Sequence, residues 1–314
     1  MCGPYRRREK GNEMIKTLVA GNVILSEQQK TELTELGLEL FFQQDEREEV
    51  LKPEQYEAVI CNGLFQFHPI DEFKNLKMIQ LTSAGLDRVP LEMIWQRKIR
   101  LCNAEDTYSI PMAEFAVSGI LQLYKNSEFF LRNKPERKWE KDRNLRELAG
   151  KQVLILGTGN VGQTLAKRLA AFDCCVTGLS RSGKPVPHFN EVSTINRLDD
   201  YLPRTDILVL AIPHTPETEG ILNEKRLQLL KEDATIVNVA RGKLADEKAL
   251  IRWLEGHPSG GAVLDVFEME PLPDENALWR LPNVVLSPHN SFVGEGNAQR
   301  LFQVMKKNLE QYVN

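Results

Sequence analysis

Three short segments in the second half of the chain carry side chains suited to proton transfer and anion binding. The segments are NVARGKLADEKAL (238–250), LDVFEMEPLP (264–273) and VVLSPHNSF (284–292). An imidazole beside a carboxylate, such as His289 with Glu270, is a suitable general acid and base. An arginine, such as Arg241, binds a carboxylate and polarises a carbonyl. Each residue alone is a common feature of a surface loop, but the three together predict a catalytic site.

These segments are expected at one edge of a parallel sheet. Short apolar runs alternate with amphipathic helical stretches along the chain, which is typical of parallel βαβ units. One series of runs ends near residue 102, and a second begins with VLIL (153–156). Between them, PMAEFAVSGILQLYKN (111–126) predicts a buried helix. Ligands of open α/β sheets bind at the carboxyl ends of the strands, so the three reactive side chains should converge on one crevice.

The first run of the second series is followed by the glycine-rich sequence GTGNVG, which contains Gly157, Gly159 and Gly162. A strand before this motif and an amphipathic helix after it are the context that dinucleotide binding requires. The first glycine permits the tight turn, the second admits the pyrophosphate, and the third allows close packing. Backbone N–H groups around Asn160 and Val161 would face the phosphates. The alternative is a glycine-rich turn without a ligand.

The next strand ends in Ser180, Arg181 and Ser182, where an enzyme that prefers NAD usually carries an acid. A carboxylate there would hydrogen-bond to the adenosine ribose and repel a 2′-phosphate. A guanidinium pairs with a phosphate instead, and the serines offer neutral donors. These residues favour NADP(H). The alternative is NAD(H) bound through other contacts, with Arg181 as a solvated loop residue.

The motifs together resemble those of the D-isomer-specific 2-hydroxyacid dehydrogenases. Asn-x-x-Arg-Gly stands at 238–242, Asp-Val-Phe-x-x-Glu-Pro-Leu at 265–272, and Pro-His at 288–289. The segments IPHTPETEGILN (212–223), LTSAGLDRV (81–89) and MAEFAV (112–117) match as well, so the resemblance runs through most of the chain from Met14. It implies hydride transfer between a nicotinamide cofactor and a small 2-keto acid or D-2-hydroxy acid, with glyoxylate and hydroxypyruvate as first candidates.

The resemblance also implies a role for each site residue. His289 would be the acid and base, Glu270 its partner in preference to Glu268, and Arg241 the group that binds substrate. The substrate carboxylate would take backbone N–H groups from the Ser83-Ala84-Gly85 loop. The further cofactor contacts that it implies are Asp265 at the nicotinamide carboxamide, with Ile212, Pro213, Val239 and Ala240. No metal ligand is expected.

The chain departs from the family pattern at two places. One is the missing acid after the second strand of the nucleotide domain. The other is Asn290-Ser291-Phe292 after His289, where the family has small and apolar residues, so substrate size does not carry over. Two other functions stay open: a dinucleotide-binding redox sensor or corepressor, and phosphite oxidation on the same fold. Glu270 argues against the formate enzymes, which carry glutamine there.

The expected fold class is α/β, with two doubly wound parallel-sheet domains. A Rossmann dinucleotide-binding domain should span 104–288. A flavodoxin-like substrate domain should combine 1–103 with 289–314, the first 13 residues forming a disordered tail or an extension upstream of the natural start. The active site is expected in the cleft between the domains. The resemblance implies a homodimer formed through the nucleotide domain.

The composition of the chain limits the binding partners and the cellular compartment that can be expected for it. The net charge is −4 and the pI is near 5.9, which argues against a nucleic-acid surface. No apolar run is long enough to cross a bilayer, and no signal-peptide core follows the basic start. The five cysteines show no paired or metal-binding spacing, which indicates free thiols in a reducing environment. We therefore expect a cytoplasmic protein with no membrane or nucleic-acid partner.

Overall fold

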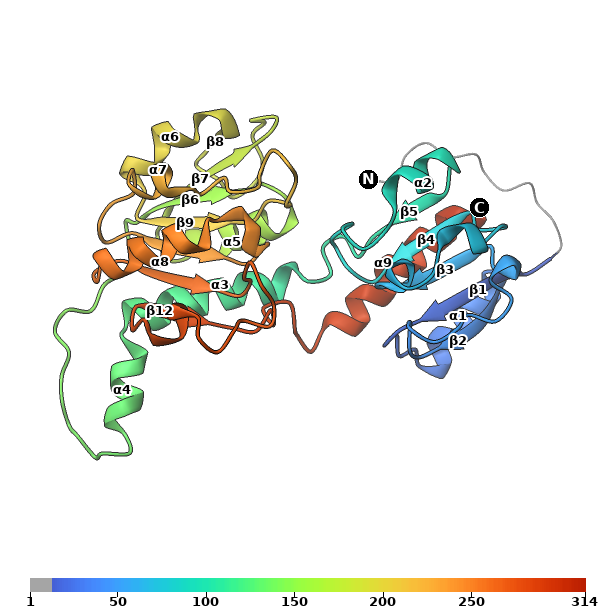
Figure 1. Cartoon of the computed structure of the whole chain (residues 1–314), viewed down its shortest axis with the longest axis horizontal. Coiled ribbons are helices and arrows are strands. Elements are labelled where there is room, and N and C mark those ends of the chain that lie inside the picture. The colour runs from blue at the N-terminus through green and yellow to red at the C-terminus, as the bar shows by residue number, and fades with distance from the viewer. Residues whose placement is uncertain (1–12) are drawn as a thin grey trace. The chain divides into compact units, whose positions relative to one another are not determined.

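The computed structural model describes residues 13–314, which fall into two compact units (Figure 1). Unit 1 combines residues 13–108 with Glu295–Asn314, and unit 2 is Ser109–Gly294. The chain passes from one unit to the other at two points, and each lies a few residues after the boundary expected from the sequence, at 103/104 or 288/289. Apart from Glu13, the tail expected over 1–13 lies outside the described residues. Each unit is described by itself below.

Unit 1 contains a five-stranded parallel sheet with the order β2-β1-β3-β4-β5, as in flavodoxin. Its strands are β1 (Ile15–Ala20), β2 (Leu38–Gln43), β3 (Ala58–Cys61), β4 (Met78–Leu81) and β5 (Arg100–Cys102). Its helices are α1 (Glu27–Glu35), α2 (Leu91–Gln96) and α9 (Asn297–Val313). Every residue of β3 and β4 is buried, which explains why these strands appear as uninterrupted apolar runs.

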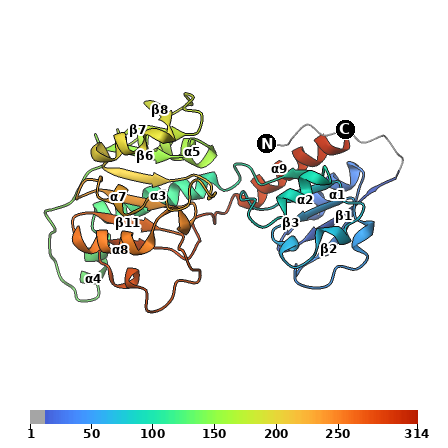
Figure 2. The ribbon, with the colours of Figure 1, turned by 45° about the horizontal axis from the view of Figure 1, so that its top comes forward.

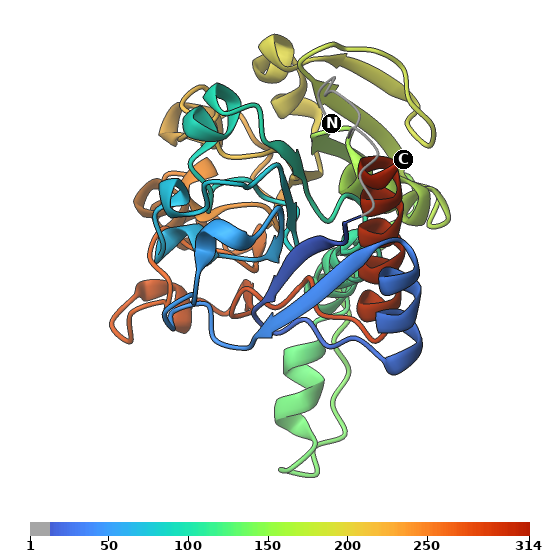
Figure 3. The same cartoon turned by 90° about the vertical axis from the view of Figure 1, so that its right-hand side faces the viewer.

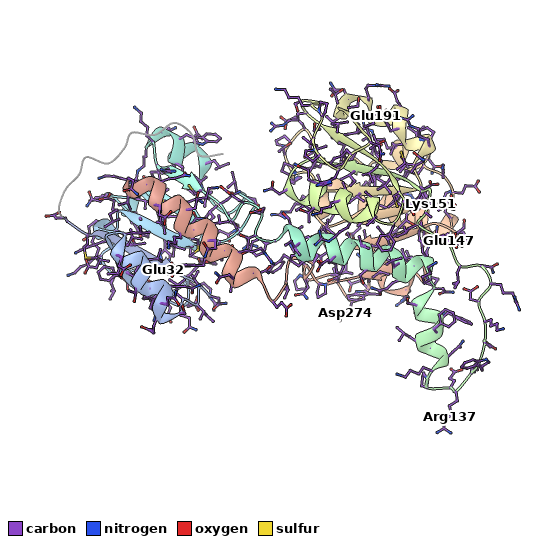
Figure 4. All side chains as sticks on the ribbon, turned by 180° about the vertical axis from the view of Figure 1, so that it is seen from behind. Glu32, Arg137, Glu147, Lys151, Glu191 and Asp274 are labelled. Atoms are coloured by element: carbon purple, nitrogen blue, oxygen red, sulfur yellow. The ribbon has the colours of Figure 1, made fainter. Side chains whose placement is uncertain are left out.

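The last helix of the chain completes the core of unit 1. In α9, Phe302, Met305 and Leu309 are buried in a cluster that includes residues of β1 and α1. The Nζ atom of Lys306 lies 2.7 Å from Oε2 of Glu32 on α1, so the two helices lie side by side (Figures 3 and 4). Unit 1 is therefore built from both ends of the described chain.

Unit 2 contains a seven-stranded parallel sheet with the order β12-β11-β10-β9-β6-β7-β8. The strands are β6 (Gln152–Leu156), β7 (Cys175–Ser180), β8 (Glu191–Thr194), β9 (Ile207–Leu210), β10 (Thr235–Asn238), β11 (Gly261–Leu264) and β12 (Val284–Leu286). The first six in chain order follow the Rossmann arrangement, with β12 added at the edge. The prediction of two doubly wound α/β domains is confirmed.

Helices cover both faces of this second sheet (Figure 2). One core contains residues of α3 (Ser109–Tyr124) and α5 (Asn160–Ala170), and the other contains residues of α6 (Leu198–Tyr201), α7 (Glu224–Leu227) and α8 (Glu247–Gly256). Gly119 brings α3 close to the sheet, because a Cβ atom there would lie 2.3 Å from Val263. The helix expected over 111–126 is thus present with slightly earlier bounds.

Two elements of unit 2 were not expected from the sequence. Strand β8 pairs with β7 at the sheet edge. Helix α4 (Ser127–Asn133) begins an arm that continues to about residue 147, with Arg137 at its far end (Figure 4). Among residues 13–314, no helix is both long enough and apolar enough to span a bilayer.

Candidate active site

The glycine-rich turn joins β6 to α5, and its geometry requires glycine at two positions. Gly157 has φ +107°, a left-handed conformation that other residues rarely adopt. A Cβ atom on Gly162 would lie 1.9 Å from the carbonyl oxygen of Gly157. By contrast, a Cβ atom on Gly159 would meet nothing within 4 Å. Gly159 is the N-cap of α5 and has no side-chain cap, so the first-turn N–H groups, including those of Asn160 and Val161, border open space. This cradle fits a phosphate group.

The strand next to this turn ends in the three residues that replace the expected acid. The Ser180 hydroxyl accepts a hydrogen bond from Gly183 N at 3.1 Å, which shapes the loop. Arg181 and Ser182 are exposed. A hydrogen bond from the Thr215 hydroxyl lowers the pKa of Glu217, and the charge of Arg181 lowers it further. The Glu217 carboxylate, from the loop after β9, is therefore within electrostatic range of Arg181.

The other expected cofactor residues follow the ends of β9 and β10. Ile212 and Val239 are buried, at 8% and 2% exposure, so their side chains belong to the core. Pro213 is exposed and Ala240 is half-buried. All four lie at the carboxyl edge of the sheet, the same edge as the glycine-rich turn.

His289 and Glu270 are in direct contact. Nδ1 of His289 lies 2.8 Å from Oε2 of Glu270, and Oε1 of Glu270 accepts the N–H of Phe267 at 3.1 Å. The backbone of His289 is left-handed, with φ +51°. Glu268 turns away, because its carboxylate accepts the N–H of Glu247 at the start of α8. Of the two acids considered from the sequence, Glu270 is the one that reaches the imidazole.

Asp265 organises the loop that carries His289. Its side chain is fully buried, and its carboxylate accepts the N–H groups of Asn290 and Ser291 at 2.7 and 3.0 Å. The Ser291 hydroxyl donates to the same carboxylate, and the Asp265 carbonyl accepts His289 N at 2.8 Å. The sequence suggested only a cofactor contact for Asp265. Of the three groups that donate to its carboxylate, only the Ser291 hydroxyl belongs to a side chain, so Ser291 was the one signal for this role in the sequence.

Arg241 begins the turn after β10, next to the strand that leads to Glu270. The Asn238 amide fixes this turn by donating to the Arg241 carbonyl at 2.9 Å and accepting from Ala240 N at 3.1 Å. Gly242 packs tightly on the neighbouring chain, since a Cβ atom there would lie 1.9 Å from the carbonyl carbon of Phe267. The Asn-x-x-Arg-Gly pattern thus builds a tight turn beside the β11 loop, in which the Arg241 guanidinium donates to the Ala240 carbonyl at 2.7 Å.

The expected substrate loop, Ser83-Ala84-Gly85, belongs to unit 1 and follows β4. It lies at the carboxyl edge of that sheet, the usual ligand edge. Within residues 13–314, no three His, Cys, Asp or Glu side chains gather into a group that could hold a metal ion.

Comparison with known proteins identifies the family. The model of the D-isomer specific 2-hydroxyacid dehydrogenase NAD binding domain matches residues 117–291. A glyoxylate/hydroxypyruvate reductase of Arabidopsis thaliana is 34% identical over 247 residues, which cover 77% of this chain and 75% of the relative. A glyoxylate reductase of Thermococcus kodakarensis is 33% identical over 252 residues, 78% of this chain and 75% of the relative.

A solved structure extends the likeness to three dimensions. The D-isomer specific 2-hydroxyacid dehydrogenase of Xanthobacter autotrophicus, determined in complex with NADPH and MES, superposes with a TM-score of 0.76. It is 27% identical, and the match covers 95% of each chain. These comparisons support a nicotinamide dinucleotide cofactor and an oxidoreductase class for the chain. The chain belongs to the D-isomer specific 2-hydroxyacid dehydrogenase family.

Proposed function

We propose that this protein reduces a small 2-keto acid to the D-2-hydroxy acid, with His289 as the proton donor. The observation that carries the proposal is the 2.8 Å contact between Nδ1 of His289 and Oε2 of Glu270. A carboxylate at this nitrogen fixes the ring orientation and stabilises the protonated imidazole. Nε2 is then the proton-donating atom.

Each residue of the site has a separate task in the proposed reaction. The bound nicotinamide supplies the hydride. His289 delivers a proton to the oxygen that develops negative charge, and it recovers that proton from solvent. Glu270 holds the imidazole in its orientation through the contact at Nδ1. Arg241 binds the substrate through its carboxylate and keto oxygens, and its charge favours the developing alkoxide. In the oxidative direction, His289 accepts the proton as a base.

NADP(H) is the proposed cofactor. The exposed Arg181 offers a cation at the end of β7, where a 2′-phosphate would lie, and the adjacent serine hydroxyls can donate to the same group. The structure of the Xanthobacter relative contains NADPH, which is consistent with this preference. The nearby Glu217 carboxylate opposes it, so NAD(H) is the competing assignment that the assay must decide.

The proposed substrates are glyoxylate and hydroxypyruvate. Two of the related proteins carry these compounds in their names, and backbone N–H groups of Ser83-Ala84-Gly85 would bind the carboxylate that both share. Phe292 lies edge-on to His289, with ring centroids 6.2 Å apart, so an aromatic ring borders the imidazole. A panel of 2-keto acids with larger side chains therefore belongs in the same test.

The test follows absorbance at 340 nm with purified protein, the keto-acid panel, and NADPH or NADH in parallel. The proposal requires turnover that His289→Gln nearly abolishes while cofactor binding persists. Tight dinucleotide binding without turnover of any keto acid would instead support a sensor or corepressor. A parallel assay with phosphite and NADP+ or NAD+ covers the remaining alternative, and reduction of the cofactor there would support phosphite oxidation instead.

We also infer a homodimer formed through unit 2. The arm that begins with α4 exposes Phe130, Leu131 and Trp139, at 42%, 67% and 96% exposure. Phe130 and Trp139 line a hollow of about 640 Å³. Exposed apolar side chains on a projecting arm suit a second copy of the chain. Light scattering on the wild type and on Trp139→Ala tests the inference, and a wild-type monomer would contradict it.

The thiols support a reducing compartment, for which we propose the cytoplasm. Within residues 13–314, Cys61, Cys174 and Cys175 are free thiols, although Cys174 and Cys175 are neighbours in sequence. Burial raises the pKa of Cys174 to about 11, so this thiol stays protonated and unreactive near neutral pH.

A further inference from the structure

The loop after β4 turns its carbonyl groups toward the body of unit 1. Each carbonyl oxygen of residues 82–85 accepts a hydrogen bond. The donors are the Tyr108 hydroxyl to Thr82, Ala104 N to Ser83 at 2.9 Å, Asn103 Nδ2 to Ala84 at 2.7 Å, and the Ser83 hydroxyl to Gly85 at 3.0 Å. Three of the four donors come from residues 103–108. That segment therefore fixes the rotation of the peptide groups in the loop.

The same rotation leaves the N–H groups of the loop available. Thr82 N donates to the Cys61 carbonyl, but no acceptor within residues 13–314 is found for the N–H groups of Ser83, Ala84 or Gly85. Ala84 is exposed, and its two neighbours are half-buried, so a ligand can reach them. Successive backbone N–H groups without acceptors form a concave site for an anion.

Asn103 is held in place by a buried chain of amides. Its carbonyl accepts Nε2 of Gln80 at 3.0 Å, and Oε1 of Gln80 accepts Nδ2 of Asn308 on α9 at 2.9 Å. Gln80 and Asn308 are 0% and 2% exposed. Buried polar groups that satisfy one another are rigid, so the backbone from which the Asn103 side chain projects has a fixed position.

Tyr108 remains a donor throughout the working pH range. Burial raises the pKa of its hydroxyl, which keeps the proton on the oxygen. Within residues 13–314, no other group donates a hydrogen bond to the Thr82 carbonyl, so no second bond could replace the one from Tyr108.

We propose that Asn103 and Tyr108 are positioning residues for the substrate carboxylate: they hold the Ala84 and Thr82 carbonyls inward, so that the N–H groups of Ser83, Ala84 and Gly85 point at the anion. This inference rests on the proposed function, because it assumes that the loop binds the carboxylate of a 2-keto acid. Neither residue touches the reacting atoms. Their loss should therefore weaken carboxylate binding and leave the chemical step nearly intact.

The test compares Asn103→Ala and Tyr108→Phe with two matched controls in the same unit. Asn75→Ala removes an amide that donates to the Glu54 carbonyl at 2.7 Å, and Tyr312→Phe removes a hydroxyl that donates to Glu57 at 2.7 Å. KM and kcat are measured with glyoxylate or the best keto acid of the panel. The inhibition constant of oxamate, an unreactive carboxylate analogue, provides a binding readout that does not depend on turnover. Thermal unfolding monitors stability.

Each test variant should raise KM and the oxamate inhibition constant about five- to tenfold, the effect of one well-placed hydrogen bond. We expect kcat and NADPH affinity to change less than about twofold, and the controls to match wild type. KM and oxamate values equal to those of the controls would overturn the inference and leave the proposed function intact. A fall in kcat with KM unchanged would also overturn it, since that pattern indicates general damage. A wild type that neither reduces keto acids nor binds oxamate would overturn both.

Discussion

Gly159→Ala should separate cofactor binding from folding. A Cβ atom on Gly159 meets nothing within 4 Å, and the backbone angles of φ −78° and ψ −163° suit alanine. The variant should therefore fold normally, and the reduced entropy of its unfolded chain can add about 0.4–1 kcal/mol of stability. The new methyl group, however, fills the space in front of the first turn of α5. A pyrophosphate could no longer approach the backbone there.

The expected loss of affinity follows from the N–H groups at this turn. A hydrogen bond to a charged group contributes about 1.5–3 kcal/mol, and the methyl should displace at least one such contact. NADPH should then bind about 10- to 100-fold more weakly. The assay is a fluorescence titration of NADPH together with urea unfolding of the same preparation.

Two other glycines provide the controls. A Cβ atom on Gly256, at the end of α8, also meets nothing within 4 Å, so Gly256→Ala should preserve both stability and affinity. Gly162→Ala should fail differently, by destabilising unit 2 by about 1–3 kcal/mol, because its methyl would collide with the Gly157 carbonyl. Wild-type NADPH affinity in Gly159→Ala would refute the reasoning, since the phosphates could not then lie over this residue.

Three further predictions concern proton transfer, cofactor choice and stability. His289→Gln should lower kcat about 10²- to 10⁴-fold, as loss of a general acid does, while the Kd of NADPH stays near wild type; a fully active variant would exclude His289 as the donor. Arg181→Ala should lower the affinity for NADPH about tenfold and change the affinity for NADH little. Glu217→Gln should raise the affinity for NADPH by up to about fivefold. Equal effects on both cofactors in titrations would contradict a 2′-phosphate contact. Burial disfavours the ionised Asp206 carboxylate, but the hydrogen bond from Lys231 at 2.7 Å and others outweigh it and lower the pKa. A carboxylate whose pKa is lowered by folding stabilises the protein fully above its unfolded-state pKa, and this contribution is lost as the pH falls toward the folded-state pKa. Asp206→Ala should therefore lower the free energy of unfolding by about 2 kcal/mol at pH 7. In urea unfolding, the difference between the variant and the wild type should shrink below about pH 4.

The fold was predictable because most strands are buried on both faces. Apolar runs such as ILVL in β9 are uninterrupted, and the glycine-rich turn marked the start of the second sheet. Strand β8 was not predicted, because its sequence EVST has a single apolar residue, Val192, and because it pairs only at the sheet edge. Its formation depends on backbone hydrogen bonds to β7, which leave little trace in side-chain pattern.

The site was predictable in part, for a related reason. Arg241, Glu270 and His289 belong to local motifs, so their types and order identified them as candidates, and their catalytic roles stay predictions. The contacts that shape their surroundings are long-range. Asp265 meets Ser291 across 26 residues, and Asn103 meets Ala84 across 19. Neither pairing has a spacing that could be recognised before the chain is folded.

The position of α9 determines the order in which the chain can fold. Unit 2 is complete once Gly294 has been synthesised, but the core of unit 1 still lacks Phe302, Met305 and Leu309. The core of unit 1 must therefore wait for α9, and its sheet leaves apolar surface uncovered while unit 2 is being made. Removal of the last helix should consequently damage the amino-terminal unit and spare the middle of the chain.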